Sequence, residues 1–321
     1  MIKHFLSFEK QVSDLEGKIE ELRHLSSGAD INIAEEIGKL QGAVSEELRS
    51  TYSKLTAWQK VQVARHPERP HFEDILNQLM EDYTPLSGDR NFADDNALTG
   101  GTAFFRGRSV VLIGIDKGKD TNDRILKNFG MARPEGYRKA IRLMQLADQF
   151  SLPILMFVDT AGAYPGKGAE ERGQAEAIAR CIQKSLQVSV PTISVITGEG
   201  GSGGAVALAV ANNTLMLEHA IYSVISPEGC SSILWRSSEN ANHAAEALKL
   251  TAQDMQKFNI IDGLVIHRVG LLFPTDPIVL VATWSEHRDN AFNATREIME
   301  SLKEQAPFWK KEFYENDSAW L

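Results

Sequence analysis

The stretch GEGGSGGA, residues 198–205, decides the fold, because it joins an apolar β-branched run to a run of small apolar residues. VPTISVIT (190–197) precedes it and AVALAVA (205–211) follows it, which is the order of a strand, a glycine-rich turn and a helix start. Its glycines allow the backbone to approach a ligand closely. The first N–H groups of the helix lack intrahelical acceptors and carry the positive end of its dipole. The sequence therefore predicts a turn that binds an anion or oxyanion through main-chain donors.

The loop also contains a dinucleotide-binding pattern, G-x-G-x-x-G, at Gly198, Gly200 and Gly203. Glu218 lies at the spacing of a ribose-binding acid. The asparagine pair at 212–213 interrupts the following helix, which is then too short for that fold. A Walker A loop is excluded because no Gly-Lys-Ser/Thr follows the glycines. A dinucleotide site is therefore the weaker interpretation.

A third pattern, G-x-S-x-G centred on Ser202, is typical of a nucleophile elbow. An elbow places its serine directly at the strand end, whereas residues 198–199 are expected to intervene here. His267 and His287 are candidate triad partners, and nothing in the sequence singles out either. The favoured interpretation is a loop that acts through its backbone, with a close-packed strand–helix crossing as the alternative.

Composition narrows the class of protein. With 321 residues and 43% apolar content, the chain can bury one large core and carry an extension. No apolar run is long enough for a membrane span, and the N-terminal apolar run is too short for a signal peptide. Cys181 and Cys230 form no C-x-x-C pair, which predicts reduced thiols in a cytoplasmic protein. The formal charge of −9 argues against general nucleic-acid binding, and no metal-ligand motif is present.

Residues 1–87 are predicted to form a helical extension, all-helical to about residue 85, before a main domain at 88–321. Two apolar stripes at three- and four-residue spacing predict a helical hairpin broken at 26–30. The stripes are Phe5, Phe8, Val12, Leu15, Ile19 and Leu22, then Ile33, Ile37, Leu40, Val44 and Leu48. We expect the hairpin to pack on its own domain, with a subunit contact as the alternative.

The main domain repeats units of strand, glycine-rich turn and helix. TAFFRGRSVVLIGI (102–115) predicts two strands, and residues 134–150 predict a helix. LPILMFVDT (152–160) predicts a buried strand that enters a second glycine-rich turn, AGAYPGKGAEERG (161–173). NTLMLEHAIYSVIS (213–226) is a third apolar stretch. This series predicts a layered α/β fold with its turns on one edge of the sheet.

The chain resembles the alpha subunits of bacterial acetyl-coenzyme A carboxylase carboxyltransferase over about residues 1–265. The matching strings are WQKVQVARHPERP (58–70), GDRNFADDNALTGG (88–101), NFGMARPEGYRKAIRLMQLA (128–147), DTAGAYPGKGAEERGQAEAIAR (159–180), GEGGSGGA (198–205) and YSVISPEGCSSILW (222–235). Long ordered strings of this kind are far more specific than one glycine motif. The resemblance implies an α/β crotonase-like fold of the ClpP/crotonase type, a spiral of ββα units with an N-terminal helical extension.

The resemblance implies transfer of a carboxyl group from N1-carboxybiotin, on the biotin carboxyl carrier protein, to acetyl-CoA. The product is malonyl-CoA, at the committed step of fatty-acid biosynthesis. Loss of CO2 from carboxybiotin leaves a ureido anion that removes the acetyl methyl proton, so the protein needs no strong acid–base pair. Backbone amides then stabilise the oxyanions. Carboxybiotin is thus a substrate, and no metal is expected in this chain.

Carried over residue by residue, Gly203 and Gly204 match the glycine pair whose amides form the alpha subunit's oxyanion hole. We expect this hole to face the biotin ureido oxygen. The residues expected to line the same cleft are Gly162, Ala163, Tyr164 and Gly166 of the second turn, and Gly200 and Gly201 of the loop. A β-branched residue at Gly204 is expected to abolish transfer and leave folding and assembly largely intact.

The sequence lacks a Met-Lys-Met biotin site, an ATP-grasp loop and a four-cysteine zinc ribbon. The resemblance therefore implies a carboxyltransferase beta subunit as partner, in an α2β2 assembly, with biotin carboxylase and the carrier protein recruited separately. The chain departs from the family at Ala161, where proline is usual. It departs again after Asp262, where the usual glycine-glycine-alanine-histidine run is missing.

Two further sets of residues are open to alternative interpretations. The first is a basic stretch that comprises Lys117, Lys119, Arg124 and Lys127. It could attract CoA phosphates or an acidic carrier surface, although a solvated face is the more ordinary interpretation. Glu199 and Glu228 would be the acid–base pair of a stand-alone acyl-CoA hydratase or hydrolase. We favour the interpretation that each carboxylate braces its turn. A non-catalytic scaffold is the third alternative.

Overall fold

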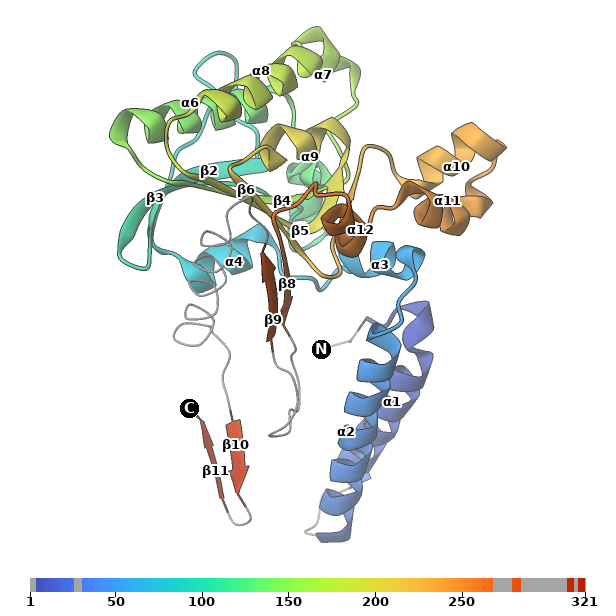
Figure 1. Cartoon of the computed structure of the whole chain (residues 1–321). Helices are drawn as coiled ribbons and strands as arrows, with labels where there is room; N and C mark the ends of the chain where they lie inside the picture. Colours follow the sequence, from blue (N-terminus) through green and yellow to red (C-terminus); the bar gives the residue numbers. More distant parts are fainter. Residues whose placement is uncertain (1–3, 26–30, 268–278, 284–310, 315–316, 321) are drawn as a thin grey trace.

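The structure, a computed structural model, describes residues 4–25, 31–267, 279–283, 311–314 and 317–320. A central sheet is covered by helices on both faces, and a helical hairpin projects away from it (Figure 1). The α-helices in these ranges are α1 (Lys10–Leu25), α2 (Ile31–Tyr52), α3 (Ala57–Ala64), α4 (Phe72–Leu79), α5 (Thr121–Leu126), α6 (Pro134–Phe150), α7 (Lys167–Glu171), α8 (Gln174–Gln187), α9 (Ser202–Ala209), α10 (Pro227–Trp235), α11 (Ala241–Leu248) and α12 (Ala252–Lys257).

The strands form one large sheet and one separate hairpin. They are β1 (Glu81–Pro85), β2 (Leu98–Phe105), β3 (Arg108–Ile115), β4 (Ile154–Thr160), β5 (Thr192–Gly201), β6 (Asn213–Leu217), β7 (Ile221–Ser223), β8 (Gly263–His267) and β9 (Val279–Thr283), with β10 (Lys311–Tyr314) and β11 (Asp317–Trp320) paired only with each other. The order in the large sheet is β1-β2-β3-β4-β5-β6-β8-β9, and β7 also pairs with β5. The run from β3 to β8 is parallel, and the strands at both ends are antiparallel. The predicted layered α/β architecture is therefore confirmed.

Strand β5 is longer than the sequence predicts. Its first part pairs with β6, and its last residues, Glu199–Gly201, pair with β7 from Ile221 to Ser223. Because β7 supplies these backbone partners, the strand continues into the predicted turn and ends only at Gly201. The apolar stretch 213–226 correspondingly contains two strands that pair with different parts of β5.

The core lies on both faces of the sheet. On one face, α6 and α9 pack against the strands and α8 packs against these two helices (Figure 1); Leu143 and Met144 of α6 are fully buried there. Burial of each such side chain contributes roughly 1.5–3 kcal/mol. On the other face, Phe72 of α4 contacts Phe157 of β4, with ring centroids 5.7 Å apart. This two-sided packing fixes the carboxyl ends of β4 and β5, from which both glycine-rich turns begin.

The N-terminal hairpin has a small core of its own. Val12 and Ile19 of α1 and Val44 of α2 are buried against each other, which confirms the predicted hairpin. The hairpin meets the rest of the chain at its base, where the Tyr52 ring lies 5.4 Å from the His219 ring. The prediction that residues up to about 85 are all helical is wrong, because 81–85 form β1, which pairs with β2.

The division into domains at residues 87 and 88 stays a prediction, as does a subunit contact through the hairpin. Among the described residues, no helix combines the length and apolar character that a membrane crossing requires.

Candidate functional site

Ser202 stands at the junction between β5 and α9. The strand ends at Gly201 and the helix begins at Ser202, whose φ of 55° is in the left-handed region. The expectation that residues 198–199 separate this serine from the strand is therefore wrong. The structure gives the Ser202 hydroxyl no hydrogen-bond partner among the described residues, and both the His267 side chain and His287 lie outside them. The short helix that follows agrees with the argument against a dinucleotide site.

The two glycine-rich turns touch at Gly204. A Cβ at Gly204 would lie 2.6 Å from the backbone N of Ala163 and 2.6 Å from the backbone C of Gly162. A Cβ at Gly201 would lie 2.3 Å from the carbonyl oxygen of Ala161. These contacts require glycine, because the atoms that occupy the space belong to rigid backbone. The expectation that a β-branched residue at Gly204 leaves folding intact is therefore wrong.

Gly203 has a different environment. Its nearest neighbours are side-chain carbons of Ile178, at 3.7 and 3.8 Å from an added Cβ. No side chain caps α9, so the N–H groups of its first turn, including those of Gly203 and Gly204, have no acceptor from the helix itself. The predicted main-chain donors are thus at the start of a helix and beside the second turn.

The second turn is held by hydrogen bonds to buried side chains. Gly162 has a φ of 153° and donates its N–H to the Thr160 hydroxyl at 3.0 Å. Gln174 donates its side-chain N–H to the carbonyl oxygens of both Ala132 and Tyr164, each at 2.9 Å. The Tyr164 N–H also donates to Ala132 at 2.9 Å. The turn is therefore fixed to the segment before α6.

The structure brings several of the predicted site residues together. Gly162 and Ala163 lie against Gly204, as the two-turn cleft requires. Tyr164 and Gly166 contact each other within the turn, and Gly200 faces Tyr222 of β7. These positions are compatible with the predicted roles, which stay predictions.

Five charged side chains form a cluster at the base of the loop, which we call the charge cluster. Lys117 Nζ lies 2.7 Å from Asp159 Oδ1 and 2.8 Å from Glu199 Oε2. Arg65 Nε, from the end of α3, lies 2.6 Å from Glu199 Oε1, and the same guanidinium pairs with Glu228 of α10. The Glu199 N–H donates to Asp159 Oδ1 at 2.8 Å. The cluster therefore ties β4, β5, α10 and the N-terminal region together.

The electrostatics of the charge cluster favour ionised carboxylates. Burial alone would raise the pKa of Glu199, but the charges of Lys117 and Arg65 outweigh it and lower that pKa. Burial likewise opposes ionisation of Glu228, and the Arg65 hydrogen bond still lowers its pKa. A buried carboxylate with a lowered pKa is a poor general acid at neutral pH. Both glutamates brace their turns, as the favoured interpretation expects.

The basic stretch is only partly a solvated face, because Lys119 is exposed whereas the side chain of Lys117 is largely buried. Lys117 belongs to the charge cluster, and the other three cations have intramolecular partners. Those contacts are Lys119 with Glu73, Lys127 with Asp116 and Asp123, and Arg124 with the carbonyl oxygens of Gly118 and Pro67. These partners weaken the alternative that the stretch recruits phosphates, because each cation is already occupied.

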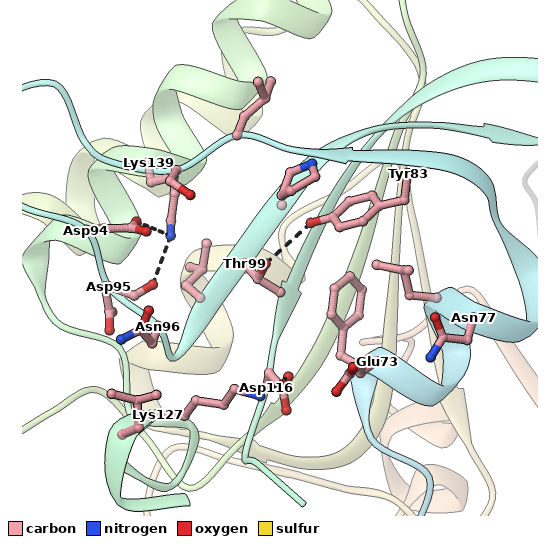
Figure 2. Close-up of a pocket in the computed structure, with 18 residues that line it drawn as sticks. Glu73, Asn77, Tyr83, Asp94, Asp95, Asn96, Thr99, Asp116, Lys127 and Lys139 are labelled. Atoms are coloured by element: carbon pink, nitrogen blue, oxygen red, sulfur yellow. Dashed lines mark hydrogen bonds and ion pairs between the residues drawn. The ribbon is translucent and has the colours of Figure 1, made fainter. Parts of the chain in front are cut away.

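A separate pocket of about 430 Å³ lies between α4, β1, β2 and α6 (Figure 2). None of the eight predicted site residues lines it. Figure 2 shows Lys139 bonded to Asp94 and to the carbonyl oxygen of Asp95, so its ammonium group is engaged. Lys127, the other lysine in its wall, pairs with Asp116. Within the described ranges, no group of three or more histidine, cysteine or acidic side chains is arranged to hold a metal ion.

Three functionally placed residues escaped the sequence analysis. Arg65 is 134 residues from Glu199 and 163 from Glu228, so no local pattern connects them. Asp159 and Gln174 lie inside the matching string 159–180, and their roles depend on contacts with other segments. Their polar character within apolar surroundings was the one available signal.

The family profile and the sequence relatives of this chain point to the same family. The profile described as "Acetyl co-enzyme A carboxylase carboxyltransferase-like" matches residues 5–309. The acetyl-coenzyme A carboxylase carboxyl transferase subunit alpha of Paramagnetospirillum magneticum is 63% identical over 288 residues, covering 90% of each chain. The protein of the same name from Rhodospirillum centenum is 64% identical over 267 residues, covering 83% of this chain and 84% of its own.

Solved structures show the same fold at low sequence identity. Transcarboxylase 12S superposes with a TM-score of 0.54 at 16% identity, over 80% of this chain. The beta subunit of geranyl-CoA carboxylase from P. aeruginosa superposes with a TM-score of 0.51 at 19% identity, over 65% of this chain. This chain spans 46% and 41% of the length of those two chains. The fold is the crotonase-like arrangement predicted above.

Proposed function

This chain belongs to the family of acetyl-coenzyme A carboxylase carboxyltransferase alpha subunits, and from this premise we propose its part of the reaction. It transfers the carboxyl group from N1-carboxybiotin to acetyl-CoA and so forms malonyl-CoA for fatty-acid biosynthesis. The observation that supports this proposal most directly is the packing of Gly204 against Gly162 and Ala163. It sets the uncapped start of α9 against the second glycine-rich turn, with backbone donors in place of a titrating side chain.

In the proposed reaction, the two substrates supply and accept every group and proton that is transferred. The N1–carboxyl bond of carboxybiotin breaks to give CO2 and a ureido anion, and N1 of that anion takes a proton from the acetyl methyl. The resulting enolate attacks CO2 and gives malonyl-CoA and biotin. In this scheme the N–H groups of Gly203 and Gly204 stabilise the ureido oxyanion, and the turn from Gly162 to Gly166 and residues Gly200 and Gly201 shape the cleft. Loss of one such donor typically costs about 100- to 1000-fold in rate.

The stand-alone hydratase or hydrolase needs a carboxyl group free to exchange protons. Glu199 is held by Lys117 and Arg65, and Glu228 by the same arginine. Their lowered pKa values keep both groups ionised near neutral pH, which suits a brace better than an acid. The charge cluster therefore favours the carboxyltransferase over that alternative.

The site requires a second subunit in this proposal. The solved carboxyltransferase chains are more than twice as long as the part this chain matches, which leaves room for a complementary half. We propose that a carboxyltransferase beta subunit supplies it, in an α2β2 assembly that receives carboxybiotin on the carrier protein from biotin carboxylase. We also place the enzyme in the cytoplasm, in agreement with the free thiols of Cys181 and Cys230.

Malonyl-CoA formation from carboxybiotin and acetyl-CoA tests the proposal. The chain is assayed alone, then with its beta subunit, and crotonyl-CoA hydration is measured in parallel. Activity that appears only in the mixture supports a shared carboxyltransferase site. Hydration by the chain alone, lost in Glu199→Gln or Glu228→Gln, would instead establish the hydratase. Carrier binding without turnover in any mixture would establish a scaffold.

A further inference from the structure

Arg133 lies beside the second glycine-rich turn, and its guanidinium forms no ion pair with an acidic side chain among the described residues. The guanidinium carbon lies 4.8 Å from the centroid of the Tyr164 ring, and Nη2 donates to Asn128 Oδ1 at 3.1 Å. The Nε atom is buried without an acceptor in the described part of the chain. Asp95, the nearby acid, accepts a hydrogen bond from the backbone N–H of Arg133 at 2.8 Å.

Two other cations close to the turns, Lys117 and Arg172, differ from Arg133 because each forms an ion pair. Lys117 is paired with Asp159 and Glu199 in the charge cluster. Arg172, at the end of α7, pairs with Glu135 through two of its nitrogens. Arg133 is thus a cation that is oriented by an aromatic ring and an amide; it forms no ion pair with a described acid, although the charge of Asp95 attracts it at longer range.

The segment that orients Arg133 has an unusual backbone. Asn128 and Phe129 have φ values of 46° and 55°, in the left-handed region, and Gly130 follows with 77°. The Thr160 hydroxyl donates to the Gly130 carbonyl at 2.7 Å, which fixes this conformation from the end of β4. Non-glycine residues persist in such conformations where surrounding contacts impose them, often at ligand sites. The conformation places the Asn128 amide oxygen against the Arg133 guanidinium.

We infer that Arg133 binds an anionic oxygen of a substrate, of the carboxylate or phosphate type, in the cleft beside Gly162–Gly166. A planar guanidinium can donate two parallel hydrogen bonds to such a group, and stacking on Tyr164 fixes its plane in advance. The turn that Tyr164 belongs to contacts Gly204 through Gly162 and Ala163, which connects the Arg133–Tyr164 pair to the proposed oxyanion-binding loop. The inference rests on the proposed function, whose reaction supplies both anions: the carboxylate of carboxybiotin and the phosphates of CoA.

Steady-state kinetics of the complete complex with its beta subunit test this inference. Arg133→Met removes the charge and keeps an apolar side chain against Tyr164, whereas Arg133→Lys keeps the charge without the planar fork. Arg108→Met is the matched control, because it removes one exposed positive charge at the start of β3. KM for carboxybiotin and KM for acetyl-CoA are measured separately, at low and high ionic strength, together with kcat and the Tm of each variant.

We expect Arg133→Met to raise one KM by about 10- to 100-fold, the loss typical of a hydrogen bond to a charged group, with a smaller change in kcat. Arg133→Lys should recover part of that loss, and Arg108→Met should match wild type. A change confined to carboxybiotin identifies the transferred carboxylate as the ligand, and one confined to acetyl-CoA identifies a phosphate. Unchanged KM values in a folded, active Arg133→Met complex overturn the inference. An inactive wild-type complex overturns the proposed function itself.

Discussion

The contact between the two glycine-rich turns makes Gly204 and its neighbour Gly203 a matched pair for substitution by alanine. Both residues lie in the first turn of α9, and both keep their N–H group when a methyl group is added. They differ in what that methyl group meets. At Gly204 it would lie 2.6 Å from backbone atoms of Gly162 and Ala163, whereas at Gly203 it would lie 3.7 Å from Ile178.

The expected magnitudes follow from these distances. Ordinary contact begins near 3.4 Å, so Gly204→Ala must separate the two turns by about 0.8 Å. Such overpacking costs about 1–3 kcal/mol in free energy of unfolding, which lowers Tm by several degrees. A displacement approaching 1 Å in a catalytic constellation lowers the rate by about 100-fold. Gly203→Ala needs no displacement, and the helix propensity of alanine contributes up to about 1 kcal/mol of stability.

Thermal unfolding of each variant and malonyl-CoA synthesis by each complex check the comparison. Gly204→Ala should lose both stability and kcat. Gly203→Ala should keep or raise Tm and retain kcat within a few-fold of wild type. Equal Tm and equal kcat in the two variants would refute the argument, because the turns would then not be held in close contact at Gly204.

Four other predictions concern titratable groups. Because the pKa of Glu199 is lowered in the folded state, its ionised carboxylate stabilises the fold above pH 4.5, the ordinary pKa, and this contribution is lost as the pH falls through the folded-state pKa. In urea titrations across pH 3–7, the free energy of unfolding of Glu199→Gln should therefore depend less on pH than that of wild type. Lys117→Met leaves buried acids without their partner and should lower the free energy of unfolding at pH 7, measured by urea titration, by about 3–5 kcal/mol. A loss below about 1 kcal/mol would contradict a stabilising role of Lys117 in the charge cluster. Burial raises the pKa of Cys181 to about 12, so a thiol reagent should modify Cys230 alone in the native chain and both after denaturation. Burial lowers the pKa of His219 to about 4, so stability should fall as the pH drops from 6.5 towards 4, and an NMR titration midpoint near 6.5 would contradict this.

Local patterns were sufficient to predict most elements of the fold. The helix at 134–150 and the second of the two strands within 102–115 have the predicted positions, because their apolar residues match the faces they bury, whereas the first strand begins at Leu98, before the predicted residue 102. The end of β5 was misjudged because three of the four residues from 198 to 201 are glycines, whose sequence signal is that of a turn. Their strand conformation depends on β7, which arrives only after α9 and β6.

The site was predictable where it is made of backbone and unpredictable where it is made of distant side chains. The glycine strings indicated both turns, and the resemblance added their roles. The pairing of Arg65 with Glu199 spans 134 residues, and the stacking of Arg133 on Tyr164 spans two separate units of the repeat. Neither contact follows from spacing along the chain, since each depends on how the elements pack.

The long sequence separations within the charge cluster have a consequence for folding order. Arg65, Lys117, Asp159, Glu199 and Glu228 come from five segments of the chain, so their mutual neutralisation waits until those segments have docked. Closing loops of this length is entropically costly and slow compared with the pairing of adjacent strands. Until Arg65 arrives, Glu199 lacks one of its two counter-charges at the base of the loop. The loop therefore reaches its final electrostatic balance only in a chain whose N-terminal region is in place.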